Sequence, residues 1–131
     1  MQAVDGATNS FLAQGVSGVQ TEVTFNSIQN GDVIASRADM VVNATPNSNL
    51  QVPAGYVAVD INGNPLSSIP VSANGQVVIE MKTGAGGFTS NQATVYPAIQ
   101  AGNASGVGSN AASASIQGSV PSTPVVVLRK L

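Results

Sequence analysis

The ionisable side chains limit the chemistry that this 131-residue chain can perform, because it contains six carboxylates, four cations, no histidine and no cysteine. Nucleophile–histidine catalysis is therefore excluded, since it requires a cysteine or serine beside an imidazole base. A serine–lysine pair would require a buried, desolvated lysine. Lys82 borders a glycine-rich segment and Lys130 lies near the end of the chain, so neither is expected to act as a base.

Paired carboxylates and ion-binding loops are the remaining chemical options. Glycoside hydrolysis needs two facing carboxylates, and the few aromatic side chains, 4% of the chain, would make poor sugar subsites. The segment from Asp60 to Asn64 has some calcium-loop spacing, but its glycine is fourth and Pro65 follows, so a type I′ turn is the simpler interpretation. Gly84–Gly87 lacks the Lys-Ser/Thr pair of a phosphate loop. We therefore predict no catalytic residue, metal or cofactor, and no enzyme activity.

The elements that would position these residues are predicted to be short strands. The chain has 19 Val and 7 Ile against 5 Leu, and β-branched side chains favour strands. Apolar and polar residues alternate from Val19 to Ile28, and a second such run extends from Val33 to Val42. Asn30-Gly31 lies between them, so the two runs predict a hairpin.

Further strands are predicted along the rest of the chain. Their ranges are Gly55–Ile61, Asn64–Val71, Gln76–Lys82, Ala93–Ile99, Ser113–Val120 and Val125–Leu131. Thr83–Asn91 reads as a flexible loop, and no apolar set persists at helical spacing. The sequence predicts an all-β chain: a single β-sandwich of seven to eight short strands over residues 19–131, jelly roll or immunoglobulin-like, preceded by an extended N-terminal arm over residues 1–18.

The predicted surface is almost uncharged, since charged residues make up 8% of the chain against roughly 25% in ordinary domains. Uncharged small side chains lose little hydration energy when another protein covers them. This surface suits permanent assemblies, although a neutral, soluble β-domain has the same composition. There is no basic cluster for nucleic acid and no apolar run for a membrane span. The N-terminal residues do not read as a secretory signal, which predicts synthesis and maturation in the cytoplasm if Met1 is native.

Contact with partners is expected at the chain ends and at one glycine-rich loop. An extended segment can add to a neighbour's sheet edge, and an exposed aromatic can fill a neighbour's pocket. For both chain ends, pairing within the chain is an equal alternative, and Phe88 could equally fold back onto its own core. The candidate interface residues are Phe11, Leu12, Phe88, Val125, Val127, Arg129 and Leu131.

Two resemblances extend these expectations. Val57–Met81 resembles the bacterial and phage immunoglobulin-like modules of invasins and phage surface proteins. The matching residues are Val59, Asp60, Gly63, Asn64, Pro65, Leu66, Pro70, Val71, Asn74, Gly75 and Gln76. The chain departs from that pattern after Val71. The family has a whole strand at this point, whereas only two residues separate Val71 from Asn74 in this chain. The whole chain is similar in type to the decoration (cement) proteins of tailed-phage heads, being short, cysteine-free, strand-rich and almost uncharged.

The decoration-protein resemblance implies a structural virion protein that binds the outer capsid surface and staples neighbouring major capsid subunits. Its partners would be the major capsid protein and further copies of itself, as a dimer or trimer, with no nucleic acid and no membrane. It would be made in the host cytoplasm and reside on the capsid surface of a bacteriophage virion. The alternatives are an immunoglobulin-like adhesin or fibre module, and a secreted filament subunit that assembles by strand exchange, both extracellular or on a cell surface.

Overall fold

Most of the regular structure is β in the computed structural model, which describes residues 2–82 and 87–131, the side chains of residues 2–5 excepted. The helices are α1 (Gln2–Ala13), α2 (Ser90–Ala101) and α3 (Ser109–Ser113). The strands are β1 (Gly18–Gln29), β2 (Asp32–Asn43), β3 (Asn49–Leu50), β4 (Tyr56–Val59), β5 (Pro65–Leu66), β6 (Ile69–Pro70), β7 (Gln76–Lys82), β8 (Ala104–Val107), β9 (Gly118–Val120) and β10 (Val125–Lys130).

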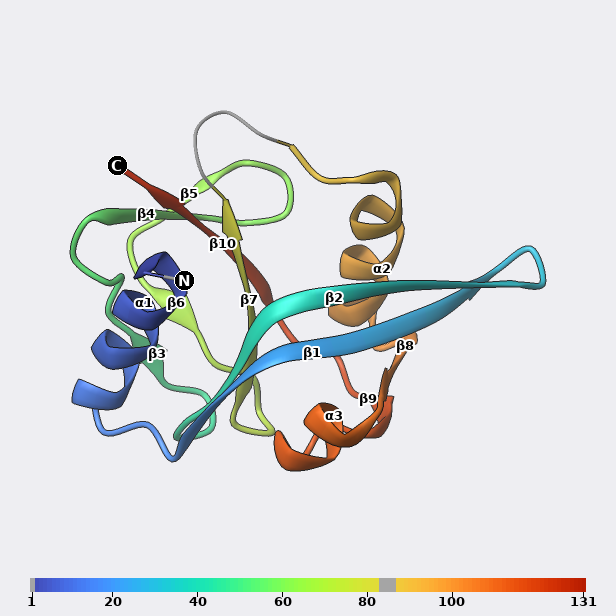
Figure 1. Ribbon diagram of the computed structural model, residues 1–131, viewed down its shortest axis with the longest axis horizontal. Coiled ribbons are helices and arrows are strands. Elements are labelled where there is room, and N and C mark those ends of the chain that lie inside the picture. The colour runs from blue at the N-terminus through green and yellow to red at the C-terminus, as the bar shows by residue number, and fades with distance from the viewer. Residues whose placement is uncertain (1, 83–86) are drawn as a thin grey trace.

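One large mixed sheet organises the molecule, with strand order β5-β4-β10-β7-β2-β1-β8-β9 (Figure 1). Its described pairs are antiparallel except β7 with β10, which run parallel, with Val125 opposite Val78. A small second sheet pairs β3 with β6. The predicted class, an all-β sandwich-like fold, is confirmed. Jelly-roll and immunoglobulin sandwiches are built mainly from antiparallel strands, whereas here a parallel pair lies near the middle of the large sheet.

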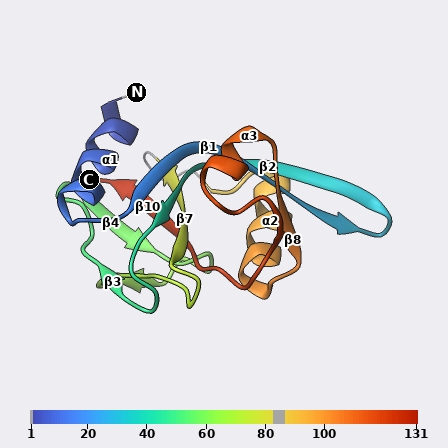
Figure 2. The same ribbon diagram turned by 90° about the horizontal axis from the view of Figure 1, so that it is seen from below.

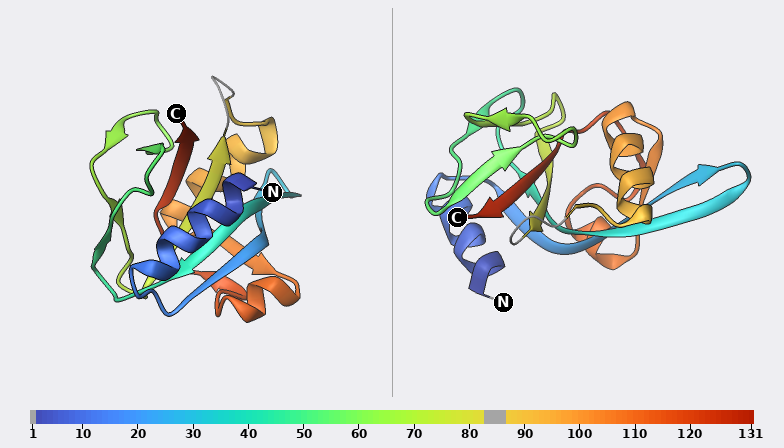
Figure 3. Two further views of the ribbon diagram at one scale, coloured as in Figure 1. Left: turned by 60° about the vertical axis from the view of Figure 1, so that its left-hand side comes forward. Right: turned by 90° about the horizontal axis from the view of Figure 1, so that it is seen from above.

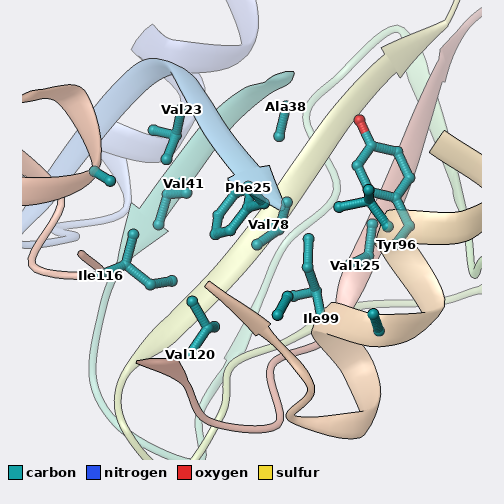
Figure 4. Close-up of a cluster of buried hydrophobic side chains, with 14 of the residues drawn as sticks. Val23, Phe25, Ala38, Val41, Val78, Tyr96, Ile99, Ile116, Val120 and Val125 are labelled. Atoms are coloured by element: carbon teal, nitrogen blue, oxygen red, sulfur yellow. The ribbon is translucent and has the colours of Figure 1, made fainter. Parts of the chain in front are cut away.

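Both faces of the large sheet are covered. On one face, α2 and α3 pack over β1, β2, β8 and β9 around Phe25, Tyr96 and Ile99 (Figure 4). On the other face, α1 and the small sheet pack over β2, β4, β7 and β10, as Figure 3 shows. Strand β7 is therefore buried along most of its length, with alternate residues facing opposite cores. Figures 1 and 2 show α1 and the end of β10 at one end of the molecule.

The predicted hairpin is confirmed as β1–β2, and its distal half projects from the body (Figures 1 and 2). Asn30 and Gly31 have positive φ of 51° and 84°, which a type I′ turn requires. The ladder between β2 and β7 ends at Met40, because the Asp39 carboxylate accepts the backbone N–H of Met81 at 2.6 Å. A side chain thus replaces the next ladder contact, and β2 continues away from β7.

The predicted extended N-terminal arm is wrong for most of its length, because Gln2–Ala13 forms helix α1. Ala7 and Phe11 lie one helical turn apart and are both fully buried in the core beneath α1. Two large or apolar positions that face the core were too few to reveal a helical periodicity in the sequence. The segment gains its helical structure by packing against the sheet.

The strand predicted at Ala93–Ile99 is also wrong, because it lies inside helix α2. Thr89 caps this helix: its hydroxyl accepts the N–H of Gln92, and the Gln92 side chain accepts the N–H of Thr89. The strand predicted at Ser113–Val120 is reduced to β9, since Ser113 ends helix α3. Of the loop predicted at Thr83–Asn91, residues 83–86 lie outside the described residues, and the last two residues belong to α2.

Candidate interaction surfaces

Glu80 on β7 is where reactive groups come together in the described chain, and it is 4% exposed. Its Oε1 accepts the Tyr96 hydroxyl at 2.7 Å, and its Oε2 accepts the Gln92 amide at 2.8 Å. Lys82 Nζ lies 3.5 Å from the same Oε2 and donates to Gln92 Oε1 at 2.9 Å. These contacts join β7 to helix α2, so the cluster fixes the helix on the sheet.

Burial raises the pKa of Glu80 above its ordinary value, the nearby Asp39 carboxylate adds to that rise, and the hydrogen bond from Tyr96 opposes it. Burial, followed by the neighbouring Glu80 charge, also raises the pKa of Tyr96. A carboxyl with a raised pKa can serve as a general acid when substrate reaches it. Here both oxygens already accept protein donors and the side chain is enclosed, so this arrangement supports a structural role.

A turn follows Asp60 as predicted and uses its carboxylate, but it is not the predicted type I′ turn, because Gly63 has positive φ and Asn62 does not. Asp60 Oδ1 accepts the backbone N–H groups of Asn62 at 2.9 Å and Asn64 at 3.0 Å. These bonds, that of Asn64 first, lower the pKa of Asp60. Gly63 supplies the positive φ, 85°, that the turn needs. Across residues 2–82 and 87–131 there is no group of three or more acidic side chains that could hold a metal ion.

Three of the seven predicted interface residues belong to the chain's own core. Phe11 lies beneath α1, while Val125 and Val127 lie in β10, and each is at most 2% exposed. Strand β10 is hydrogen-bonded on both sides, to β4 and to β7. These three side chains are therefore not available to a partner in this fold. Phe88 is partly buried and packs edge-on against Tyr96, with ring centroids 5.2 Å apart, so it folds back onto its own core.

The other predicted residues remain at the surface. Leu12 and Leu131 are exposed, and Arg129 is partly exposed beside a groove described below. Leu131 lies beside β4, where its N–H donates to the Gly55 carbonyl, and Val57 of that strand is also exposed. The elements that carry Leu12, Val57 and Leu131 lie at the end of the molecule opposite the hairpin turn (Figures 1 and 2). We call these three residues the body end.

The hairpin tip, residues 28–33, is a surface that the sequence reasoning missed. Ile28 is 70% exposed and Val33 is 64% exposed, and they are directly opposite each other in the ladder. Their Cβ atoms are therefore about 5 Å apart, so the two side chains form one apolar knob. Residues 28–33 are all exposed, and Asp32 follows the turn beside the knob. The hairpin extends beyond the part that a partner strand or helix covers, and no sequence signal marks where that cover ends.

A groove of about 230 Å³ lies over β4 and β10. Its lining consists of Val59, Asp60, Ile61, Asn62, Gly63, Gly87, Phe88, Val127 and Arg129. The apolar side chains form its floor, while the Asp60–Gly63 turn and Arg129 are its polar elements. We call this feature the β4–β10 groove.

Comparison with protein-family models, with curated proteins and with solved structures gives no match to this chain. Within the described residues, no helix combines the length and apolar character needed to cross a membrane.

Proposed function

We propose that this protein is a structural component of a bacteriophage particle, which binds the outer surface of the capsid and holds neighbouring major capsid subunits together. The observation that carries the proposal is the location of the exposed large apolar side chains. Among the described side chains, two of these lie at the hairpin tip, and the other three lie on elements at the opposite end of the molecule (Figure 1). The body end supplies a contact to the shell, and the separate hairpin tip is left to reach a neighbouring molecule.

The low charge of the chain supports the same proposal. With four cations and six carboxylates in 131 residues, most of the surface is uncharged. Such a surface can be covered by another protein without burying unpaired charges. Many copies on one shell would bind by avidity, so each contact can be modest. Strand exchange, the basis of the filament alternative, would require β10 to leave two paired neighbours, which the fold does not favour.

Binding to empty shells is the direct test. The purified chain is mixed with shells assembled from the major capsid protein encoded in the same genome, and the shells are then sedimented. We expect saturable co-sedimentation at a fixed ratio of chain to capsid protein. The absence of binding, or the absence of a capsid gene from that genome, would overturn the proposal.

A matched pair of variants locates the contact. The double variant Leu12→Asp, Leu131→Asp places charges on the body end and is expected to lose shell binding. The control Ser113→Asp, Ser119→Asp adds the same charge at exposed positions on the far side of the molecule and is expected to bind like the wild type. Equal binding by both variants would remove the body end from the contact.

A further inference from the structure

We propose that the hairpin tip of one copy docks into the β4–β10 groove of a second copy of this chain, in a head-to-tail contact. This inference goes beyond the capsid proposal and does not depend on it, because the contact forms between identical chains in the absence of a shell.

The tip has the form of a docking element. Ile28 and Val33 are directly paired and mostly exposed, so the chain presents two β-branched side chains to solvent at the end of a projecting ribbon. Burying such side chains against another protein is favourable because it removes apolar area from water. The ribbon is already ordered by its own ladder and by the Asn30-Gly31 turn. Little conformational entropy is therefore lost when the tip docks.

The groove matches the tip in chemistry. Its floor presents Val59, Ile61 and Phe88, which are apolar and partly exposed, and can accept two aliphatic side chains. The tip and the groove carry opposite charges, because Asp32 lies in the exposed tip while Arg129 lines the groove. This complementarity favours a second copy as the occupant.

The strand order makes the contact intermolecular. Strand β10 is separated from the hairpin by β7, and the tip points away from the body (Figures 1 and 3). The groove, in contrast, is lined by residues of β4, β10 and the segments beside them. A tip therefore cannot reach the groove of its own chain. Because the two contacting surfaces differ, each bound copy still offers one free tip and one free groove. Such heterologous contacts produce closed rings or open chains of molecules.

Charge reversal in separate copies tests the contact in solution by analytical ultracentrifugation of the full chain without shells. The wild type is expected to increase in mass with concentration. Asp32→Lys and Arg129→Glu are each expected to weaken self-association about tenfold, since each places like charges together. An equimolar mixture of the two variants should regain wild-type assembly. In that mixture a Lys tip meets a Glu groove, and an Asp tip meets an Arg groove.

A second mixture tests that the contact is head-to-tail. Ile28→Ser, Val33→Ser removes the knob and is expected to weaken self-association about a hundredfold. In a mixture with Arg129→Glu, the variant without the knob contributes an intact groove, and Arg129→Glu contributes an intact tip. At concentrations too low for Arg129→Glu to self-associate, the mixture should therefore stop at a dimer with one contact. Circular dichroism confirms that each variant is folded, and Leu12→Ser, which removes an exposed apolar side chain from α1, should assemble like the wild type.

Three results would overturn the inference: a wild-type chain that remains monomeric at millimolar concentration, tip variants that assemble like the wild type, or charge-reversed variants that fail to complement each other. The capsid proposal fails by a different result, the absence of shell binding, so the two failures can be distinguished.

Discussion

Glu80 shows how a single buried carboxylate can fasten a helix to a sheet. It lies within the apolar strand β7, and its oxygens accept donors from Tyr96, Gln92 and Lys82, two of which lie on α2. Because an enclosed carboxylate is costly unless its acceptors are used, each donor stabilises the docked position of the helix.

Tyr96→Phe removes one of these donors while keeping the ring that packs against Phe88. We expect the free energy of unfolding to fall by about 1–3 kcal/mol, because a buried carboxylate oxygen loses its partner. Urea denaturation measures this loss. Thr94→Ala, which removes a partly exposed hydroxyl that donates to the Ser90 carbonyl at the surface of the same helix, should change stability by less than about 0.5 kcal/mol. Equal effects of the two substitutions would contradict the role assigned to Glu80.

The raised pKa of Glu80 predicts a pH dependence of stability. The folded state holds the proton of Glu80 at a higher pH than the unfolded state, whose carboxyl has the ordinary value of 4.5. The contribution of this group to stability is therefore complete below pH 4.5 and is lost as the pH rises through the folded-state pKa. The groups facing it are Tyr96, Lys82 and Asp39.

The contribution of Glu80 is measured by comparing the free energy of unfolding of the wild type with that of Glu80→Gln between pH 4 and 7. The other carboxylates are the same in both proteins, so their contributions cancel. Relative to the variant, the wild type should lose stability as the pH rises, by no more than about 1.4 kcal/mol per pH unit. A relative gain with rising pH would mean that folding lowers the pKa of Glu80.

At the scale of elements, strands were predictable where alternation and turn chemistry agreed. The β1–β2 hairpin follows from alternating residues on both sides of Asn30-Gly31, and both strand ranges are correct within a residue. Helix α2 was missed because its inward positions include a glutamine: Gln92, Val95, Tyr96 and Ile99 have helical spacing, but only three of them are apolar. The internal Pro97 also argued against a helix, and the β-branched Val95 favoured a strand.

Helix α1 provides a prediction about stability at the scale of elements. Phe11→Ala should lower the free energy of unfolding by about 3–5 kcal/mol, because Phe11 is fully buried between the helix and the sheet. The adjacent Leu12→Ala should cost far less, since Leu12 is 51% exposed. Urea denaturation of the two variants compares them directly. A small effect of Phe11→Ala would mean that residues 2–13 behave as an arm that can be removed from the body.

The molecule as a whole has two separated surfaces, and the sequence predicted only part of them. Of the residues predicted to contact partners, Leu12 and Leu131 are exposed, whereas Phe11, Val125 and Val127 are buried in the chain's own core. The error has a physical cause, since an apolar residue near a chain end looks the same in sequence whether its own sheet or a neighbour covers it. The tip could not be predicted, because its exposure depends on where β7, β8 and α2 stop covering the hairpin.

The two surfaces predict different losses on a shell. Ile28→Ser, Val33→Ser should leave the binding of single copies to shells intact, because the body end is unchanged, but should abolish the cooperativity of that binding. Titration of labelled chain onto shells, followed by sedimentation, separates these effects. A tip variant that fails to bind at all would assign the shell contact to the hairpin.

Electron cryomicroscopy of shells decorated with this protein tests the central claim most directly, because it places each copy relative to the capsid subunits. We predict density on the outer surface at the boundaries between neighbouring capsid subunits, with the body end on the shell and the hairpin directed toward the next copy. Bare shells, or copies that each contact a single capsid subunit, would contradict the proposal that the protein holds neighbours together.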